Sequence, residues 1–213
     1  ILTESVHRKL INTRIAVKIR TLELLSVLDM LCLVILIVIQ TLAAMKMSVL
    51  NKLLEQRAYT DAHTGLPNKD ACEELLNNKE KVAEHTACIM FDLNNLKIIN
   101  DTKGHSKGDQ LILNFARLLR NVIPQKDFVG RYGGDEFMAV IYNTSKTEIE
   151  DILKQLSREK DRLNSSGNNM PIDYACGWAI SDADSECTIQ MLLDKADYYM
   201  YENKQAYKKS KKS

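Results

Sequence analysis

The residues best suited to chemistry are acids at the ends of predicted strands. In Arg131-Tyr-Gly-Gly-Asp-Glu-Phe137, two glycines precede the adjacent acids Asp135 and Glu136. Such glycines suit a tight hairpin because each tolerates a positive φ, and their missing side chains let a phosphate approach the backbone. Asp92 ends the predicted buried strand Cys88-Ile-Met-Phe-Asp92. Carboxylates at one sheet edge can bind Mg²⁺ together with substrate phosphates, so Asp92 and Asp135 suggest metal-assisted phosphoryl or nucleotidyl transfer.

Each of these acids also has a plainer interpretation. The glycines and their two acids could form an ordinary hairpin with solvated charges, and Asp92 could be a turn residue. The residues alone leave both interpretations open.

Alternating helices and strands are predicted from residue 60 onward, and they would position these acids. Interleaved elements with a hairpin predict an α/β fold, an α+β sandwich with a central mixed or antiparallel sheet flanked by helices. We expect helices at 68–79, 107–122, 146–163 and 188–205, strands at 86–93 and 172–180, a hairpin at 128–142 and a polar loop at 164–169.

An apolar segment at residues 24–45 precedes this region. A helix of this length spans about 33 Å, enough for the hydrocarbon core of a bilayer. Met30–Ile39 is apolar at every position, and Asp29 lies near one end, where it can reach the interface. We therefore predict a long N-terminal transmembrane helix, with a buried dimerisation helix as the alternative.

The predicted domain organisation has five parts. Residues 46–60 carry an apolar stripe and would form a linker helix, which either pairs with its copy in a dimer or simply connects the parts. Because the chain begins at Ile1, we interpret it as a fragment. The parts are a flanking segment 1–23, the transmembrane helix 24–45, the linker 46–60, a catalytic domain 61–208 and a basic, disordered tail 209–213.

Composition excludes several classes of protein. The net charge of +1 provides no field that would attract nucleic acid, so no nucleic-acid partner is expected. Five scattered cysteines argue against a disulfide framework and indicate a reducing compartment. The four histidines lack metal-ligand spacing, so a zinc site is not expected.

Residues 60–208 resemble the GGDEF family of diguanylate cyclases along nearly their whole length. The signature is intact at residues 133–137, and separate motifs in the family's order are more specific than one pentapeptide. These motifs are Asp61-Ala-His-Thr-Gly-Leu-Pro-Asn68, with His63 where Leu is usual; Phe91-Asp-Leu-Asn-Asn-Leu-Lys-Ile-Ile-Asn-Asp-Thr-Lys-Gly-His105; Ser106-Lys-Gly-Asp109; and Ala196-Asp-Tyr-Tyr-Met-Tyr-Glu-Asn-Lys204.

The resemblance implies a metal centre and a catalytic acid. Asp92, Asp135 and the Leu93 carbonyl would bind Mg²⁺ or Mn²⁺. Glu136, beside the metal with Asp135, would act in catalysis, either on the metal or by deprotonating the attacking 3′-hydroxyl.

The resemblance also implies a guanine site. Asn100 and Asp109 would hydrogen-bond the guanine edge, and an Asp accepts from the N1–H and N2–H groups. Asn100 could instead be a turn residue, and Asp109 lies three residues after Ser106, where a capping acid belongs.

Phosphate contacts are implied at three places. Lys204 and Lys208 share one helix face, although Lys208 replaces the usual Arg and both could simply complement the helix dipole. The glycines of the signature would admit a phosphate. The backbone N–H groups of the loop would cradle the β- and γ-phosphates. The residues are Leu93, Asn94, Asn95 and Leu96 in the loop, and Gly133 and Gly134 in the signature.

One departure concerns feedback inhibition. Many members carry an RxxD site for product inhibition, and the corresponding residues here are Pro124-Gln-Lys-Asp127. Because Pro cannot contact a phosphate in bidentate fashion, this site is degenerate and only Asp127 remains.

The function implied by the resemblance is condensation of two GTP molecules into cyclic di-GMP and pyrophosphate. Each subunit would supply half a site, so a two-fold homodimer is required. The expected location is the bacterial inner membrane, with the catalytic domain in the cytoplasm. The alternative is a catalytically silent GGDEF module that binds GTP or a partner. A mixed cyclic dinucleotide product and a related nucleotidyl transferase are further alternatives, which the guanine-binding residues disfavour.

Overall fold

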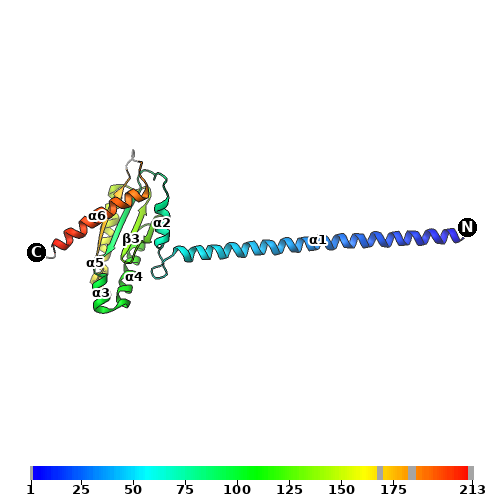
Figure 1. Ribbon diagram of the computed structural model, residues 1–213, viewed down its shortest axis with the longest axis horizontal. Helices are drawn as coiled ribbons and strands as arrows, with labels where there is room; N and C mark the ends of the chain where they lie inside the picture. The colour runs from blue at the N-terminus through cyan, green and yellow to red at the C-terminus, as the bar shows by residue number, and fades with distance from the viewer. Residues whose placement is uncertain (1, 167–169, 182–185, 211–213) are drawn as a thin grey trace. The chain divides into compact units, whose positions relative to one another are not determined.

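The computed structural model describes residues 2–166, 170–181 and 186–210, which fall into two units, Ile1–Glu55 and Gln56–Ser213. Helix α1, Leu2–Tyr59, makes up the described part of the first unit (Figure 1). It runs without interruption through the predicted membrane segment and the predicted linker. Its large apolar side chains are exposed along the described part of its length.

The second unit is built on one four-stranded sheet with the order β2-β3-β1-β4. Every pairing is antiparallel, so the antiparallel form of the predicted sheet is confirmed and the mixed form is wrong. The strands are β1, Ala87–Leu93; β2, Phe128–Arg131; β3, Glu136–Ile141; and β4, Tyr174–Ile180.

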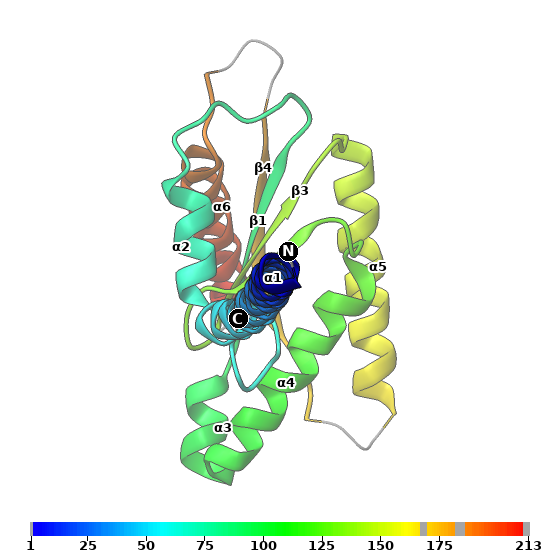
Figure 2. The same ribbon diagram turned by 90° about the vertical axis from the view of Figure 1, so that its right-hand side faces the viewer.

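Helices cover both faces of this sheet, as predicted (Figure 2). Side chains alternate along β1, so Ile89 and Phe91 join the core beneath α4 and α5, whereas Cys88 and Met90 join the core beneath α2 and α6. The helices are α2, Lys69–Asn77; α3, Leu96–Lys103; α4, His105–Val122; α5, Lys146–Ser165; and α6, Ile189–Ser210.

Several predicted boundaries need correction. Helix α3 was not predicted, because it is short and its apolar residues Leu96 and Ile99 are only partly buried against the core. Gly104, with φ 84°, separates it from α4. Helix α5 includes the first two residues of the predicted loop 164–169, of which 167–169 lie outside the described residues. Helix α6 includes residues 209–210 of the predicted disordered tail, and 211–213 also lie outside the described residues.

Helix α6 packs closely on β4 at Gly177. A Cβ on Gly177 would collide with backbone atoms of α6, Met200 N and Ala196 O, which no side-chain rotation can relieve. Beside this point, Asn203 Nδ2 donates to the Cys176 carbonyl at 2.8 Å. The missing side chain at Gly177 therefore fixes how deeply α6 sits on the sheet.

Replacing Gly177 with Ala should destabilise the domain. The added methyl forces α6 off β4, and overpacking of this kind costs about 1–3 kcal/mol in free energy of unfolding. Denaturant unfolding measures the change. Gly134→Ala is the matched control, because a Cβ there meets nothing within 4 Å. Equal stability of the two variants would contradict the close packing.

Candidate active site

The predicted acids are brought together by the pairing of β1 with β3. Asp92, near the end of β1, lies opposite Glu136, the first residue of β3. The next residue, Leu93, donates its N–H to the Asp135 carbonyl at 2.8 Å. The exit of β1 and the hairpin between β2 and β3 are therefore joined through main-chain bonds. Asp92 and the adjacent acids Asp135 and Glu136 therefore meet at one sheet edge, although Asp92 is distant in sequence from the other two.

One lysine balances part of this negative charge. Asp92 is buried, at 8% exposure, and its Oδ1 lies 2.6 Å from Lys204 Nζ on α6. That contact is an ion pair, and Oδ1 accepts no hydrogen bond of regular geometry from the described residues. Partial burial raises the pKa of Glu136, and the charges of neighbouring acids raise it further, while Lys204 lowers it. The contributing acids are Asp135, Asp92 and Asp197.

The donors at this edge fit a hard divalent cation. Among the described residues, no three His, Cys, Asp or Glu side chains form a preformed metal cage. Mg²⁺ does not need one, because it usually binds one or two carboxylates and keeps water or substrate phosphate as its other ligands. Asp92 and Asp135 would hold it, with Glu136 beside them. Asp92 Oδ1 is buried and accepts no hydrogen bond of regular geometry from the described residues, which supports this assignment. The Leu93 carbonyl stays a prediction.

The signature glycines act differently from the sequence prediction. The described glycines with positive φ are Gly65 and Gly104, so the hairpin does not use the tolerance of Gly133 and Gly134 for a positive φ. A Cβ on Gly133 would lie 2.6 Å from Glu136 Oε2, the flexible end of that side chain, so the Glu136 carboxylate would have to move. Gly134 has open space around it, which leaves its backbone accessible.

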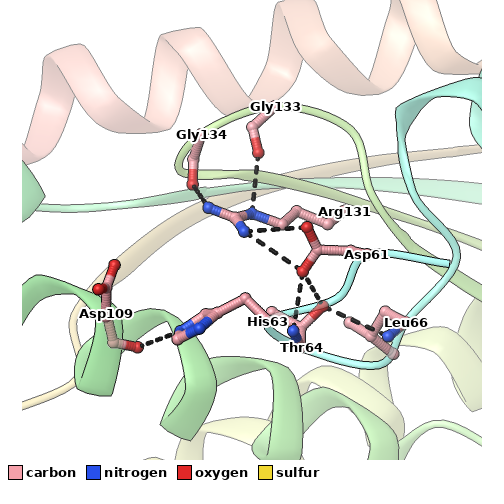
Figure 3. A network of polar contacts seen from close by, with 8 residues as sticks. All are labelled: Asp61, His63, Thr64, Leu66, Asp109, Arg131, Gly133 and Gly134. Atoms are coloured by element: carbon pink, nitrogen blue, oxygen red, sulfur yellow. Dashed lines mark hydrogen bonds and ion pairs between the residues drawn. The ribbon is translucent and has the colours of Figure 1, made fainter.

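A polar network braces this hairpin (Figure 3). Arg131 donates from Nε to the Gly133 carbonyl at 3.1 Å and from one terminal nitrogen to the Gly134 carbonyl at 2.8 Å. Its other terminal nitrogen pairs with Asp61 at 3.2 Å. Burial opposes ionisation of Asp61, but bonds from Thr64 and the charge of Arg131 outweigh it and lower the pKa. No role was predicted for Arg131, although it lies two residues before the signature.

The two predicted base-binding residues do not have their plainer roles. Asn100 lies inside α3 rather than in a turn, and its Oδ1 is buried without a hydrogen-bond partner in the described chain. A Cβ on Gly108 would collide with that same oxygen. Helix α4 begins after Gly104 without a side-chain cap, so Ser106 lies inside the helix and Asp109 is not a capping acid. The capping-box interpretation was therefore wrong.

The predicted phosphate cradle is smaller than expected. The N–H groups of Leu93 and Asn94 donate to Asp135 and Asp173 carbonyls, both at 2.8 Å, and cannot also bind phosphate. The N–H groups of Asn95 and Leu96 stand at the start of α3, where helix donors lack intrahelical partners. Lys208 lies in α6, and its side chain is outside the described residues.

The chain matches the model of one protein family, described as the diguanylate cyclase GGDEF domain, over residues 58–210. The chain belongs to the GGDEF-domain diguanylate cyclase family. The antiparallel sheet and its flanking helices are the fold of this family, and the long helix α1 lies almost entirely before the matched residues.

Several relatives are similar to this chain. It is 30% identical to the diguanylate cyclase DgcP of Escherichia coli, over 75% of this chain and 48% of that protein. It is 32% identical to the cyclic di-GMP phosphodiesterase PdeB of Shewanella oneidensis, over 68% of this chain and 17% of that protein. The chain thus spans half or less of the length of these relatives.

A solved structure shows the same fold. The GGDEF domain of DgcB from Caulobacter crescentus, in complex with c-di-GMP, aligns with a TM-score of 0.60 at 25% identity. The alignment covers 70% of this chain and 89% of that domain. Together with the diguanylate cyclases among the relatives, it supports a nucleotidyl cyclase domain in cyclic di-GMP signalling.

Replacing Glu136 with Gln should stabilise the metal-free fold at pH 7. An acid whose folded pKa is raised resists ionisation, so its charge destabilises the folded state above that pKa and protonation relieves the effect. The gain in melting temperature should disappear as the pH falls below the ordinary Glu pKa of 4.5. Thermal unfolding between pH 8 and pH 4 measures it. Glu74→Gln, an exposed change on α2, is the control, and an E136Q variant less stable than wild type at pH 7 contradicts the account.

Proposed function

We propose that this chain is a diguanylate cyclase that condenses two GTP molecules into cyclic di-GMP and pyrophosphate. One observation carries the proposal: Asp92, Asp135 and Glu136 converge at one sheet edge with Lys204 against them. Such an arrangement binds a divalent cation and a triphosphate together.

The residues at this site would have different roles in the reaction. A bound Mg²⁺ or Mn²⁺ would neutralise charge on the triphosphate. Lys204 places a positive charge next to the same acids. Glu136, whose pKa is raised, is suited to accept the proton of the attacking 3′-hydroxyl, so that the 3′-oxygen bonds to the α-phosphorus while the bond to pyrophosphate breaks.

Recognition of the base is assigned to the other end of the site. Asn100 has an unpartnered buried Oδ1, and the Asp109 carboxylate has no hydrogen-bond or ion-pair partner among the described residues. Guanine presents N–H donors that such oxygens accept. The phosphates would extend toward the N–H groups of Asn95 and Leu96.

Catalysis requires two copies of the chain, because each domain binds one GTP and the product joins two. The exposed apolar side chains of α1 supply a surface on which two copies can associate. A two-fold arrangement would present both GTP molecules to each other symmetrically.

Helix α1 also supports attachment to a membrane. Within His7–Tyr59 it is long and apolar enough to cross a bilayer, and its apolar stretch is not buried in the chain. We assign residues 24–45 to the bacterial inner membrane, with the catalytic domain in the cytoplasm, where GTP is found. The excess of basic residues before position 24 favours the opposite orientation by the positive-inside rule.

The direct test is incubation of the chain with GTP and Mg²⁺, followed by mass analysis of the product. We expect cyclic di-GMP and pyrophosphate from wild type, and a loss of at least about 100-fold in Asp135→Ala, because a metal ligand is removed. Glu74→Gln, an exposed change on α2, should retain activity. A folded dimer that binds GTP and yields no cyclic product would leave the silent-module alternative, and a mixed dinucleotide would revise the substrate.

Feedback by cyclic di-GMP at the degenerate site should be absent. Pro124 cannot bind phosphate, and Asp127 Oδ1 already accepts the Tyr142 N–H at 3.0 Å. Asp127→Ala should therefore lower the free energy of unfolding by about 1 kcal/mol without altering the product's effect on rate. Initial rates with added cyclic di-GMP test this. Saturable inhibition that disappears in Asp127→Ala would contradict it.

A further inference from the structure

We propose that His63 is a positioning residue for guanine recognition, because it holds the main chain of Asp109 from the entry turn, residues 60–67. The inference rests on the proposed function and names a specificity determinant of that site. The corresponding motif of the family, residues 61–68 here, usually has Leu at this position, and a Leu side chain cannot donate a hydrogen bond.

The contact joins residues that lie 46 positions apart. His63 Nε2 lies 2.8 Å from the Asp109 carbonyl oxygen. A carbonyl only accepts, so Nε2 carries the hydrogen in this contact. In Figure 3 the Asp109 carbonyl points toward His63, whereas its carboxylate points away. His63 can therefore hold the backbone of Asp109 and leave its carboxylate available to a ligand.

The start of α4 needs such support. Its N-cap is Gly104, with φ 84° and no side-chain cap, and Gly108 lies in its first turns. A glycine N-cap costs roughly a few tenths of a kcal/mol relative to a side-chain cap, and an interior glycine costs about 1 kcal/mol of helix stability. Asp109 is the fifth residue of this helix. A hydrogen bond from outside the helix fixes the turn whose side chain would read the base.

The entry turn is itself held rigidly. The Asp61 carboxylate accepts from the Thr64 N–H at 2.8 Å and from the Thr64 hydroxyl at 2.6 Å, and it pairs with Arg131. Arg131 in turn holds the carbonyls of Gly133 and Gly134. The turn therefore contacts the hairpin that carries the acids through Asp61.

Through these contacts the entry turn connects the predicted base-binding end of the site to the predicted metal-binding end. Through His63 it holds the predicted base-binding residue, and through Asp61 it holds the hairpin beside the predicted metal ligands (Figure 3). Loss of the His63 bond should loosen base recognition and leave the acids in place. The effect should therefore appear in KM for GTP and much less in kcat.

The experiment compares His63→Met, which has similar volume without a donor, with His63→Gln, whose amide nitrogen can replace Nε2 as the donor. The full chain is assayed for KM and kcat with GTP and titrated with a non-hydrolysable GTP analogue. We expect His63→Met to raise KM and weaken analogue binding about 5-fold, which is the size of one exposed hydrogen bond. His63→Gln should stay close to wild type.

A double-mutant cycle adds a readout that a merely structural role would not change. In an Asp109→Ala background, His63→Met should cause no further loss of analogue binding, because the group that it positions is gone. Thermal unfolding of each variant checks the fold.

Two results would overturn the inference alone: unchanged KM and analogue binding in His63→Met, or an equal additional loss in the Asp109→Ala background. In both, wild type still makes cyclic di-GMP, so the proposed function stands. Wild type that binds no guanine nucleotide would overturn both.

Discussion

The site depends on one constraint, the register in which β1 pairs with β3. It sets Asp92 opposite Glu136 and lets the Leu93 N–H bond the Asp135 carbonyl. A shift of one residue in the pairing would turn every β1 side chain to the opposite face of the sheet. Each side chain would then be buried in the other core. The apolar pattern that builds the two cores therefore also places the acids. Function is tied to folding through this register.

Two further contacts hold the edge from opposite sides. Helix α6 reaches it because Gly177 allows a close approach to β4, which brings Lys204 against Asp92. The entry turn reaches it through Asp61 and Arg131. The acids remain in excess over the single lysine, as the raised pKa of Glu136 indicates. This excess of negative charge is what a divalent cation would relieve.

The sheet, most of the helices and the meeting of the acids were predictable, because apolar periodicity and the separate motifs both specify them. Individual contacts between segments that are distant in sequence could not be predicted. The donors of Leu93 and Asn94 are used by carbonyls from other segments, which no local pattern reveals. Helix α3 is short and only partly buries Leu96 and Ile99 against the core. The close approach of Gly133 to the Glu136 side chain becomes apparent only in three dimensions.

The central claim is that the register-paired acids form one metal centre. Titration with Mn²⁺, followed by electron paramagnetic resonance in the presence of a non-hydrolysable GTP analogue, tests it most directly. The account predicts that Asp92→Asn weakens Mn²⁺ binding at least about tenfold, because a carboxylate ligand becomes a neutral amide, whereas the exposed change Asp151→Asn on α5 leaves it unchanged. Equal Mn²⁺ affinity in wild type and Asp92→Asn would contradict it.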